Sequence, residues 1–422
     1  MRSAVVVGAG VGGLAAAGAL ARTGWQVTLL ERAERLLADP AALFLWPNGF
    51  RALRALGLAA GLDGISWPTP ATGIRRPDGQ WLVQPPAGPV GTATPSVVHR
   101  EDLHDALVAG LGDRIDIRNG VTVRTVSVRP DDRPTVSDGR STWEADLVVA
   151  ADGVDSAIRA RLVREARAIS SGCAAWRAVI PWYRASALPA DLPATGETLG
   201  AGYRFRHALL GERGSAGAST RGGVYWTATA VGAPRPEPPA TQLALLRRWF
   251  AGWHAPIGDL LAVTEPDDLV HHAVRELRPL PPSYSFPAGP GGVVLLGDAA
   301  HAMPHHLAQG ACLAFEDAAT LRILVRDTVP GETLRASLDA YTRYRTARAA
   351  RLLRLSHRVG RVLQARGRFG QRARDASLGM LSPRILDRAT ADAANWHPPA
   401  GAPGAPGAQG APGAPGAQSA GT

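Results

Sequence analysis

A glycine pattern near the N-terminus constrains the fold more than any other feature of the sequence. Gly8, Gly10 and Gly13 follow the apolar run AVVVGAG and lie at the start of GGLAAAGALARTG, which is rich in Ala and Leu and ends at Gly24. The next run, WQVTLLER, is again apolar and ends in an acid and an arginine. This order of strand, tight turn, helix and strand predicts a βαβ unit over residues 1–32.

Each glycine of this turn has a physical reason. The first permits the tight turn, the second lets the backbone approach a pyrophosphate, and the third lets the helix pack closely on the strand. The helix N-terminus then presents free N–H groups to the phosphates, and an acid at the end of the second strand accepts hydrogen bonds from an adenosine ribose. The alternative is a glycine turn that serves packing alone. We expect a dinucleotide site that includes Gly8, Gly10, Gly12, Gly13, Glu31 and Arg32.

Two later strand ends carry further polar motifs. Asp152-Gly153-x-x-Ser156-x-x-Arg159 follows the apolar run LVVA, and Gly297-Asp298-Ala299-Ala300-His301 follows VVLL. Pro304 comes next, and Gln309-Gly310-Ala311-Cys312 then opens a helix. Singly, each motif is compatible with an ordinary strand-end turn. We expect all three strand ends to converge on one long nucleotide.

With these motifs the chain resembles the aromatic-ring hydroxylase family of FAD monooxygenases, the group of para-hydroxybenzoate hydroxylase, salicylate hydroxylase and zeaxanthin epoxidase. The resemblance runs from residue 1 to about 365 and includes LWPNGFRALRALGL, VVHREDLHDAL, CAAWRAVIP and GDAAHAMPHHLAQGACLAFEDAATL. It implies FAD as the cofactor and NAD(P)H as a transient co-substrate. It also implies that Asp152 contacts both nucleotides, that Asp298 binds the ribityl chain, and that Arg100 reaches the flavin or the pyrophosphate.

The resemblance implies an α/β fold with a Rossmann-like FAD-binding domain of the para-hydroxybenzoate hydroxylase type, an interleaved antiparallel-sheet substrate domain and C-terminal helices. We expect the FAD-binding domain in residues 1–65, 99–170 and 284–330, and the substrate domain in 66–98 and 171–283. Residues 331–397 are expected to form C-terminal helices. Residues 398–422, where GAP and GAQ triplets recur, are expected to form a disordered tail, with a collagen-like helix as the weaker alternative.

The implied reaction consumes NAD(P)H and O2 and gives a hydroxylated or epoxidised aromatic or polycyclic product through a flavin C4a-hydroperoxide. The helix that opens near Gly310 and Ala311 is placed to direct N–H groups at the negative charge of reduced flavin, with Pro304 just before it. A phenolic substrate benefits from a base. The candidate bases are His207, His305 and His306, each with a structural role as the alternative.

Other residues of the expected substrate domain carry weaker expectations. Arg177 is placed either to meet an anionic substrate or to form a salt bridge in the sheet. We interpret His301 as structural. Five aromatic residues either roof the site or fill the core face of the sheet: Trp176, Tyr203, Phe205, Tyr225 and Trp226. Two motifs depart from the family pattern: Ala308 stands where relatives have glycine, and His305 and His306 stand in the loop before the helix.

Charge is concentrated near the C-terminus. The chain carries a net charge of +10 without any lysine, and residues 335–374 hold twelve arginines and one acid, Asp339. We interpret this segment as a helix with a basic solvated face, and an anionic partner is the alternative. The chain shows no apolar run of membrane-spanning length and no signal peptide, so we expect a cytoplasmic protein without nucleic-acid or membrane partners, as a monomer or homodimer.

The two cysteines, Cys173 and Cys312, are expected to be small buried residues, and we expect no metal site. Three further functions stay open: an FAD-dependent reductase, dehydrogenase or halogenase that inserts no oxygen, an enzyme that uses NAD alone, and a non-enzymatic module that binds through its basic C-terminal segment.

Overall fold

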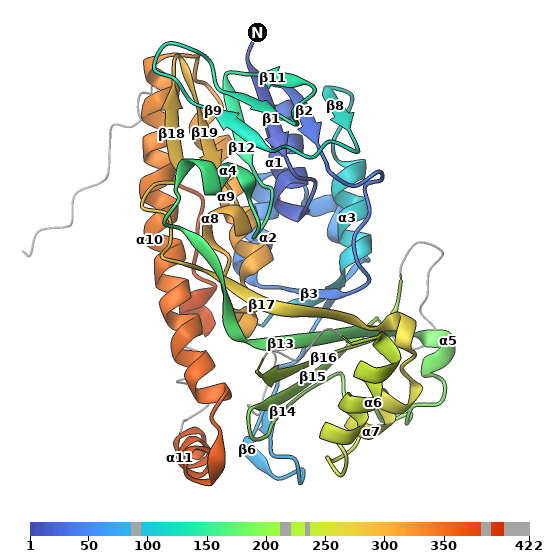
Figure 1. Cartoon of the computed structure of the whole chain (residues 1–422). Coiled ribbons are helices and arrows are strands. Elements are labelled where there is room, and N and C mark those ends of the chain that lie inside the picture. The colour runs from blue at the N-terminus through green and yellow to red at the C-terminus, as the bar shows by residue number, and fades with distance from the viewer. Residues whose placement is uncertain (86–93, 212–220, 233–236, 381–389, 401–422) are drawn as a thin grey trace, which may run out of the picture.

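Two large sheets organise the molecule, and a long helix runs along one side past both of them (Figure 1). The computed structural model describes residues 1–85, 94–211, 221–232, 237–380 and 390–400. The repetitive C-terminal tail therefore lies outside the described residues. Among the described residues, none of the helices combines the length and the apolar character that crossing a bilayer requires.

The first sheet has six strands, of which all but the edge strand β18 are parallel to their neighbours. Its central strands are continuous apolar runs that are almost fully buried, which is typical of a parallel sheet covered on both faces. In spatial order the strands are β18 (Ser285–Ala288), β19 (Gly291–Leu295), β12 (Leu147–Ala150), β1 (Ser3–Val7), β2 (Gln26–Leu30) and β8 (Ile115–Arg118).

Helices pack against this sheet and against one another: α1 and α2 contact α9, and α3 contacts α1. Their bounds are α1 (Val11–Arg22), α2 (Pro47–Ala55), α3 (Arg100–Ala109), α4 (Ala157–Leu162), α8 (Asp298–His301) and α9 (Gly310–Val325), with the 3-10 turns η1 (Ala59–Leu62) and η3 (His305–Leu307). A small antiparallel sheet adds Val126 and Val136 to the same core. Its strands are β9 (Thr125–Ser127), β10 (Thr135–Ser137) and β11 (Thr142–Glu144).

The second large sheet has seven strands and is antiparallel except where β14 pairs with β5. Its order is β17 (Val270–Arg278), β13 (Arg167–Pro181), β16 (Gly223–Val231), β15 (Tyr203–Leu210), β14 (Thr195–Leu199), β5 (Ile74–Arg75) and β6 (Trp81–Val83). An antiparallel sheet in this part of the chain is what the alternating sequence predicts. One face packs under α6 (Pro239–Trp249) and α7 (Ile257–Val263), near the short α5 (Trp182–Ala185) and η2 (Pro266–Asp268).

The opposite face of the seven-stranded sheet meets a third, three-stranded sheet. Ala208, Leu210 and Tyr225 pack there against Phe44 and Val97. The small sheet consists of β3 (Ala42–Leu45), β7 (Ser96–His99) and β4 (Ser66–Pro68). The described part of residues 66–98 therefore divides between two sheets, since β5 and β6 join the seven-stranded one.

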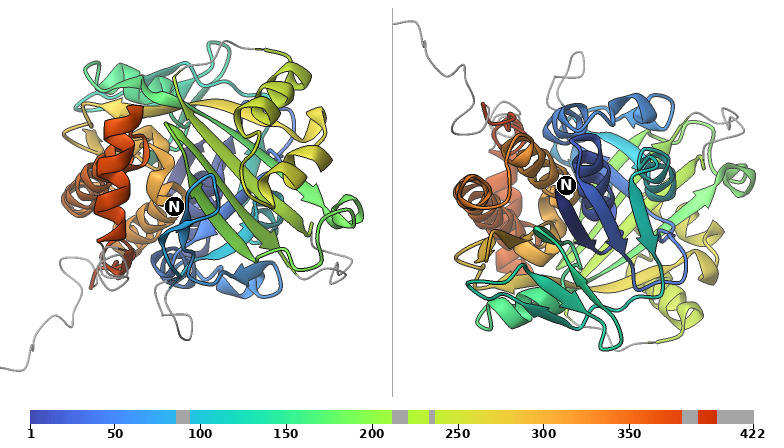
Figure 2. Two further views of the ribbon diagram at one scale, coloured as in Figure 1. Left: turned by 90° about the horizontal axis from the view of Figure 1, so that it is seen from below. Right: turned by 90° about the horizontal axis from the view of Figure 1, so that it is seen from above.

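Two C-terminal helices complete the described chain. The helix α10 (Glu332–Leu363) runs along both layers, and α11 (Gly367–Gly379) lies at the end of the molecule remote from the N-terminus (Figure 1). Both lie within residues 331–397, where the sequence predicts C-terminal helices. Seen from below, the seven-stranded sheet lies in front, and seen from above, the six-stranded sheet does (Figure 2). Both cysteines are buried and unpaired, as expected.

Candidate active site

The glycine turn after β1 has three different geometries at its three glycines. Gly8 has φ +100°, and a Cβ on it would lie 2.4 Å from the Ala151 carbonyl oxygen. A Cβ on Gly13 would lie 1.8 Å from the Gly8 carbonyl oxygen, so α1 approaches β1 only because no side chain is there. Around Gly10, in contrast, no atom lies within 4 Å of the position of a Cβ. The turn thus combines close packing at two glycines with open space at the third.

Glu31 lies at the end of β2 and faces this turn. The Ala9 N–H donates to its Oε2 at 2.7 Å, and the Ala33 N–H donates to its Oε1 at 2.9 Å. The side chain is only half-buried, so its remaining lone pairs are open to a ligand. Arg32, the next residue, is exposed.

The second motif begins where β12 ends, beside the glycine turn. Gly153 has φ +80°, and the Ser156 hydroxyl caps α4 by accepting from the Arg159 N–H at 2.9 Å. Asp152 accepts from the Ile158 N–H at 3.4 Å through Oδ2, but its Oδ1 is buried without a hydrogen-bond partner among the described residues. Burial raises the pKa of this carboxyl, against weaker hydrogen bonds that lower it. An orphaned buried acceptor of this kind favours a ligand that donates to it.

Arg159 connects the second motif to the third. Its buried guanidinium donates to the Val154 carbonyl at 2.7 Å and to the Ala299 carbonyl at 3.2 Å. Ala299 lies in α8, directly after β19. The turns that follow β12 and β19 are therefore held together, as the parallel pairing of these strands requires.

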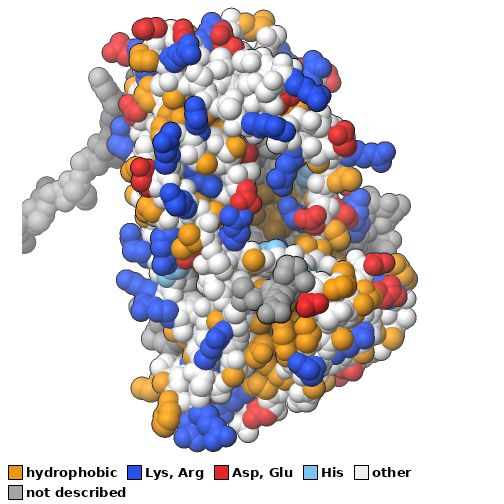
Figure 3. All heavy atoms as spheres, viewed as in Figure 1, with side chains coloured by type: hydrophobic (Ala, Val, Ile, Leu, Met, Phe, Trp, Pro, Cys, Tyr) orange, Lys and Arg blue, Asp and Glu red, His pale blue; other side chains and the backbone are white. Residues whose placement is uncertain are grey.

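Asp298 is the exposed residue of an otherwise buried turn. Ala299, Ala300 and His301 are buried, whereas the Asp298 side chain is open to solvent. Even so, the surrounding protein raises the pKa of Asp298 by desolvation, while His301, Arg100 and Arg159 act to lower it. Asp298 therefore lies in the floor of a recess rather than on a convex surface. Figure 3 shows such a hollow at mid-height of the molecule, between the two sheet layers.

The loop from Pro304 to Gly310 leads into α9 and borders the same region. Ala308 adopts a left-handed conformation, with φ 50° and ψ 38°. Gly310 is half-buried, and no atom lies within 4 Å of the position of a Cβ on it. The first turn of α9, which includes Ala311, carries no acidic side chain and no side-chain cap. Its free N–H groups are thus open to an anionic or carbonyl group.

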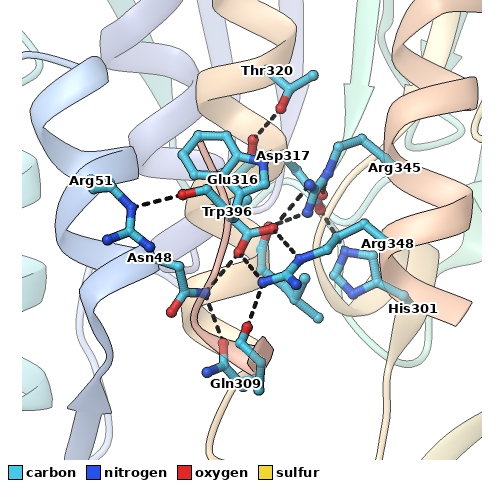
Figure 4. A network of polar contacts seen from close by, with 12 residues as sticks. Asn48, Arg51, His301, Gln309, Glu316, Asp317, Thr320, Arg345, Arg348 and Trp396 are labelled. Carbon is cyan, nitrogen blue, oxygen red and sulfur yellow. Dashed lines mark hydrogen bonds and ion pairs between the residues drawn. The ribbon is translucent and has the colours of Figure 1, made fainter. Parts of the chain in front are cut away.

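A buried ionic network holds the third motif, which begins at Gly297, in position (Figure 4). Asp317 of α9 accepts from the Gly297 N–H at 2.9 Å and contacts His301 Nε2 at 2.6 Å. Arg345 of α10 pairs with Asp317 at 2.6 Å and with Glu316 at 3.0 Å. His301 therefore has the structural position that we inferred for it.

The same network extends to α2 and to the C-terminal segment. Glu316 also pairs with Arg348 at 2.9 Å and accepts from the Asn48 amide at 2.7 Å. Asn48 donates in addition to Gln309, the residue before α9, and Arg348 donates to the Ala393 carbonyl. The start of α9 is thus positioned by residues of three other segments (Figure 4).

The face of the seven-stranded sheet that is turned toward these motifs is basic. Arg204 and Arg206 both pair with Glu197, at 2.9 and 3.2 Å, and the Arg206 guanidinium lies over the Phe44 ring. Arg177 of β13 is half-buried and has no hydrogen bond or ion pair within the described residues. The salt bridge that was one alternative for Arg177 is therefore not present in this part of the chain.

Two histidines lie close to Arg177. The ring centroids of His272, on β17, and His305, in the loop before α9, are 6.5 Å apart. Both nitrogens of His305 are buried without a partner among the described residues. Burial, and secondarily Arg177, lower the pKa of His305 well below its ordinary range and the pKa of His272 to about 3. Both imidazoles are therefore neutral at neutral pH.

The other two candidate bases lie elsewhere. His207 is on the face of β15 that packs toward α6 and α7, and its Nε2 contacts the Pro193 carbonyl at 3.1 Å. This face lines a separate cavity of about 570 Å³, which also includes His254 and Thr198. His306 is wedged against Gly360 of α10, with Gln364 3.2 Å from its Nε2. The structure thus brings His305, but neither His207 nor His306, to the space beside Arg177.

Four of the five aromatic residues that were expected to roof the site or fill the sheet pack under α6 and α7. These are Trp176, Tyr203, Phe205 and Trp226. Tyr225 alone of the five faces the other sheet layer. Arg100, at the start of α3, pairs with Asp39 at 3.2 Å and acts on the pKa of Asp298, so it borders the same recess.

His272 is the residue near this site that sequence reasoning missed. The dipeptide His271-His272 lies in β17, and the pairing of Ala175 with His272 puts its ring on the same face as Arg177. His271 stacks instead on Trp176 on the other face. Alternation along a strand was the available signal, but it required the register of β17 against β13.

These features fit a long dinucleotide. Five features follow one another along the carboxyl ends of strands and the helix after them. They are the open space at Gly10, the half-free carboxylate of Glu31, the Asp152 Oδ1 without a partner among the described residues, the exposed Asp298 and the free start of α9. Ligands of α/β sheets bind at such strand ends. No group of three or more metal-ligating side chains occurs within the described residues.

Comparisons with known proteins agree with this arrangement. Residues 1–179 and 282–356 match the family model described as FAD binding domain. The chain is 31% identical to the aurachin C monooxygenase/isomerase of Stigmatella aurantiaca, over 92% of this chain and 96% of that protein. It is 33% identical to the 3-amino-4-hydroxybenzoate 2-monooxygenase of Streptomyces cremeus, over 85% of this chain and 86% of the relative.

Solved structures give the same result. A variant of HpxO from Klebsiella pneumoniae, complexed with FAD, superposes with a TM-score of 0.78 at 25% identity, over 93% of this chain and 98% of the other. A 2-methyl-3-hydroxypyridine-5-carboxylic acid oxygenase variant superposes with a TM-score of 0.68 at 26% identity, over 94% and 97% of the two chains.

Proposed function

The chain belongs to the FAD binding domain family and is an FAD-dependent monooxygenase of the aromatic-ring hydroxylase type, and we propose that its substrate is an aromatic or polycyclic small molecule that binds as an anion. NAD(P)H is the reductant typical of this family. Bound FAD supplies the chemistry, reduction by NAD(P)H and activation of O2, while the protein supplies position, electrostatics and exclusion of water. The observation that carries the proposal is that Arg177 is half-buried and has no ion pair among the described residues.

We assign the cofactor contacts to the three strand-end motifs. The glycine turn from Gly8 to Gly13 receives the pyrophosphate, and Glu31 accepts from the adenosine ribose. Asp298 accepts from hydroxyl groups of the ribityl chain. The free N–H groups at Gly310 and Ala311 stabilise negative charge on the reduced flavin ring.

Arg177 supplies the charge for the substrate. A half-buried guanidinium without a counter-ion among the described residues loses part of its hydration, and an anion that forms hydrogen bonds to it offsets that loss. Arg204 and Arg206 share the single carboxylate of Glu197, so this face of the sheet keeps a further net positive charge. An ionised phenol, enol or acidic ring nitrogen suits these surroundings better than a neutral ring does.

His305 is the hydrogen-bond partner that we assign to the same acidic group. Its two ring nitrogens have no partner within the part of the chain that the structure describes, and each buried unsatisfied group costs roughly 1–3 kcal/mol until a ligand satisfies it. Arg177 opposes protonation of His305. A neutral imidazole keeps one N–H donor, so His305 donates a hydrogen bond to the substrate anion that pairs with Arg177.

Two measurements test the proposal. Product formed under labelled O2 should carry one labelled oxygen atom; consumption of NAD(P)H without label in the product would indicate a reductase or dehydrogenase instead. Arg177→Gln should raise KM for an acidic aromatic substrate roughly tenfold or more, because a charge-assisted hydrogen bond contributes about 1.5–3 kcal/mol.

The control for Arg177 is Arg167→Gln, an exposed arginine on the same strand β13. Flavin absorbance should be the same in both variants, which separates a substrate effect from loss of cofactor. The O-methyl ether of the substrate, which cannot ionise, should bind wild type and Arg177→Gln equally. An equal loss for ether and parent compound would contradict anion binding while leaving the monooxygenase assignment intact.

A further inference from the structure

The helix α11 presents apolar side chains to solvent instead of to the core. Phe369 is 87% exposed, and Met380, which directly follows the last residue of α11, is 85% exposed. Ala373 and Ala376 are exposed between them. Steps of four, three and four residues place all four on one side of a helix. We call these four residues the α11 stripe.

The opposite side of α11 is the one that packs against the protein. Leu378 lies in a cluster with Leu82, Val83 and Leu363. Arg374, also buried, donates to the Gly200 carbonyl at 2.7 Å. The α11 stripe therefore points away from the core, and its exposure does not come from a helix that has failed to pack.

The surroundings of the α11 stripe are strongly basic. Arg361, Arg366, Arg368 and Arg372 are exposed and have no acidic partner among the described residues, and residues 361–372 contain no acid. Asp375, the acid of α11, is already paired with Arg76 at 3.1 Å and Arg374 at 2.8 Å. Figure 3 shows blue and orange side chains together at the lower end of the molecule, where Figure 1 places α11.

We propose that α11 docks the enzyme on the surface of an anionic lipid bilayer, with the α11 stripe inserted below the headgroups and the four arginines on the lipid phosphates. A bilayer surface has negatively charged phosphates above a hydrocarbon layer. The phosphates complement the arginines, and the hydrocarbon complements the α11 stripe. A nucleic acid offers phosphates but leaves Phe369 and Met380 in water.

A second copy of the chain is a poorer occupant of this face. In a two-fold dimer each residue near the axis meets its own counterpart or a close neighbour, so the four arginines of both copies would be brought together. The expectation of no membrane partner rested on the absence of a spanning segment. Surface docking through a short amphipathic helix needs no such segment.

The test is sedimentation of the FAD-loaded, full-length protein with vesicles. Vesicles of phosphatidylcholine mixed with phosphatidylglycerol should carry the protein down, and phosphatidylcholine alone should not. Added salt should release the protein, because screening weakens attraction to the charged surface. Arg368→Gln and Arg372→Gln should each lower the partition coefficient roughly fivefold, the equivalent of about 1 kcal/mol per basic residue near such a surface.

Matched controls exist elsewhere on the chain. Phe369→Ser should lower the partition about tenfold or more, whereas Leu37→Ser, at another apolar residue that is 77% exposed, should not change it. Arg335→Gln, at the far end of α10, should also have no effect. None of these residues lies in the proposed site, so flavin absorbance and NAD(P)H oxidation in solution report intact folding.

Three outcomes overturn the proposal: equal sedimentation with both vesicle types, no sedimentation with either, or variants that sediment like the wild type. Binding to single-stranded RNA without binding to anionic vesicles would assign the face to a polyanion instead. A dimer in solution that Phe369→Ser dissociates would assign it to a second copy.

Discussion

Ala308 is the one described residue other than glycine with a positive φ. A left-handed conformation costs an L-residue roughly 1–2 kcal/mol relative to glycine, the residue that the family resemblance gives for this position. The sequence indicated that Ala308 alters this loop. The physical form of the change is local backbone strain just before α9.

Replacing Ala308 by glycine should therefore not destabilise the protein. The relief of strain exceeds or balances the roughly 0.5–1 kcal/mol of extra chain entropy that glycine loses on folding, so the free energy of unfolding should stay equal or rise by up to about 1 kcal/mol. Urea unfolding measures this. Ala376→Gly, at an exposed position of α11, is the control, because glycine should lower the free energy of unfolding there. A loss of the same size for Ala308→Gly would contradict the assignment of strain.

Residue identity and residue position were not equally predictable. Gly8, Gly13 and Asp298 follow from local motifs, because the turn itself determines where they lie. His207 and His272 do not, because the face that a strand residue occupies depends on its alternation and on the register of the strand. That Arg177 has no ion pair among the described residues depends on every acid that the fold brings near it, and no local sequence pattern indicates that.

The helices were largely predictable, whereas the contacts between them were not. The sequence predicted a helix that opens at Gln309 and one or two long helices over residues 332–381, and the structure has α9, α10 and α11 there. The ionic network between them joins Glu316 and Asp317 to Arg345. In a helical sequence pattern, charged residues such as Glu316 and Asp317 indicate a solvent-facing side. Only the packing of α9 against α10 shows that they are buried.

Breaking this network should be costly. Arg345→Met leaves the fully buried Asp317 without an arginine partner and the fully buried Glu316 with Arg348 alone. Removal of one partner of a buried ion pair typically costs roughly 3–5 kcal/mol. Chemical denaturation should show a loss of about that size. Arg335→Met, at an exposed position of the same helix, should change stability by less than about 0.5 kcal/mol. Equal effects of the two variants would mean that the network does not stabilise the fold.

Four neutral histidines make the whole protein sensitive to acid. Burial lowers the pKa of His207 and His306 to about 4 and the pKa of His272 to about 3, and it lowers the pKa of His305 as well. Below pH 6.5 the unfolded chain binds protons that the folded chain does not. Stability should therefore be nearly constant above about pH 6.5 and decrease as the pH falls from there toward 4.

His207→Gln is the variant that isolates one contribution. The 5% exposed His207 accounts for about 3 kcal/mol of the loss once the pH is below its folded-state pKa. The amide of glutamine retains a donor for the Pro193 carbonyl without titrating. Unfolding free energies across this pH range should fall less steeply in the variant. An unchanged slope would show that His207 does not titrate as described.

The arrangement of the two layers could not be read from the sequence. The order of seven strands, in which β5 and β6 join from far upstream, arises from long-range pairing. The family resemblance anticipated an interleaved chain, but not that the described part of residues 66–98 divides between two sheets. The recess between the layers holds both the proposed cofactor contacts and the basic face of the sheet.

The central claim is that the three strand-end motifs hold FAD, and titration of FAD into two apo variants tests it most directly. Gly10 has extended backbone angles and open space around it, so Gly10→Ala should fold with wild-type stability yet lose FAD affinity, because the methyl group occupies the place of the pyrophosphate. Gly13→Ala should instead unfold more easily even without FAD, since its Cβ meets the Gly8 carbonyl. Wild-type FAD affinity in a folded Gly10→Ala protein would contradict the account.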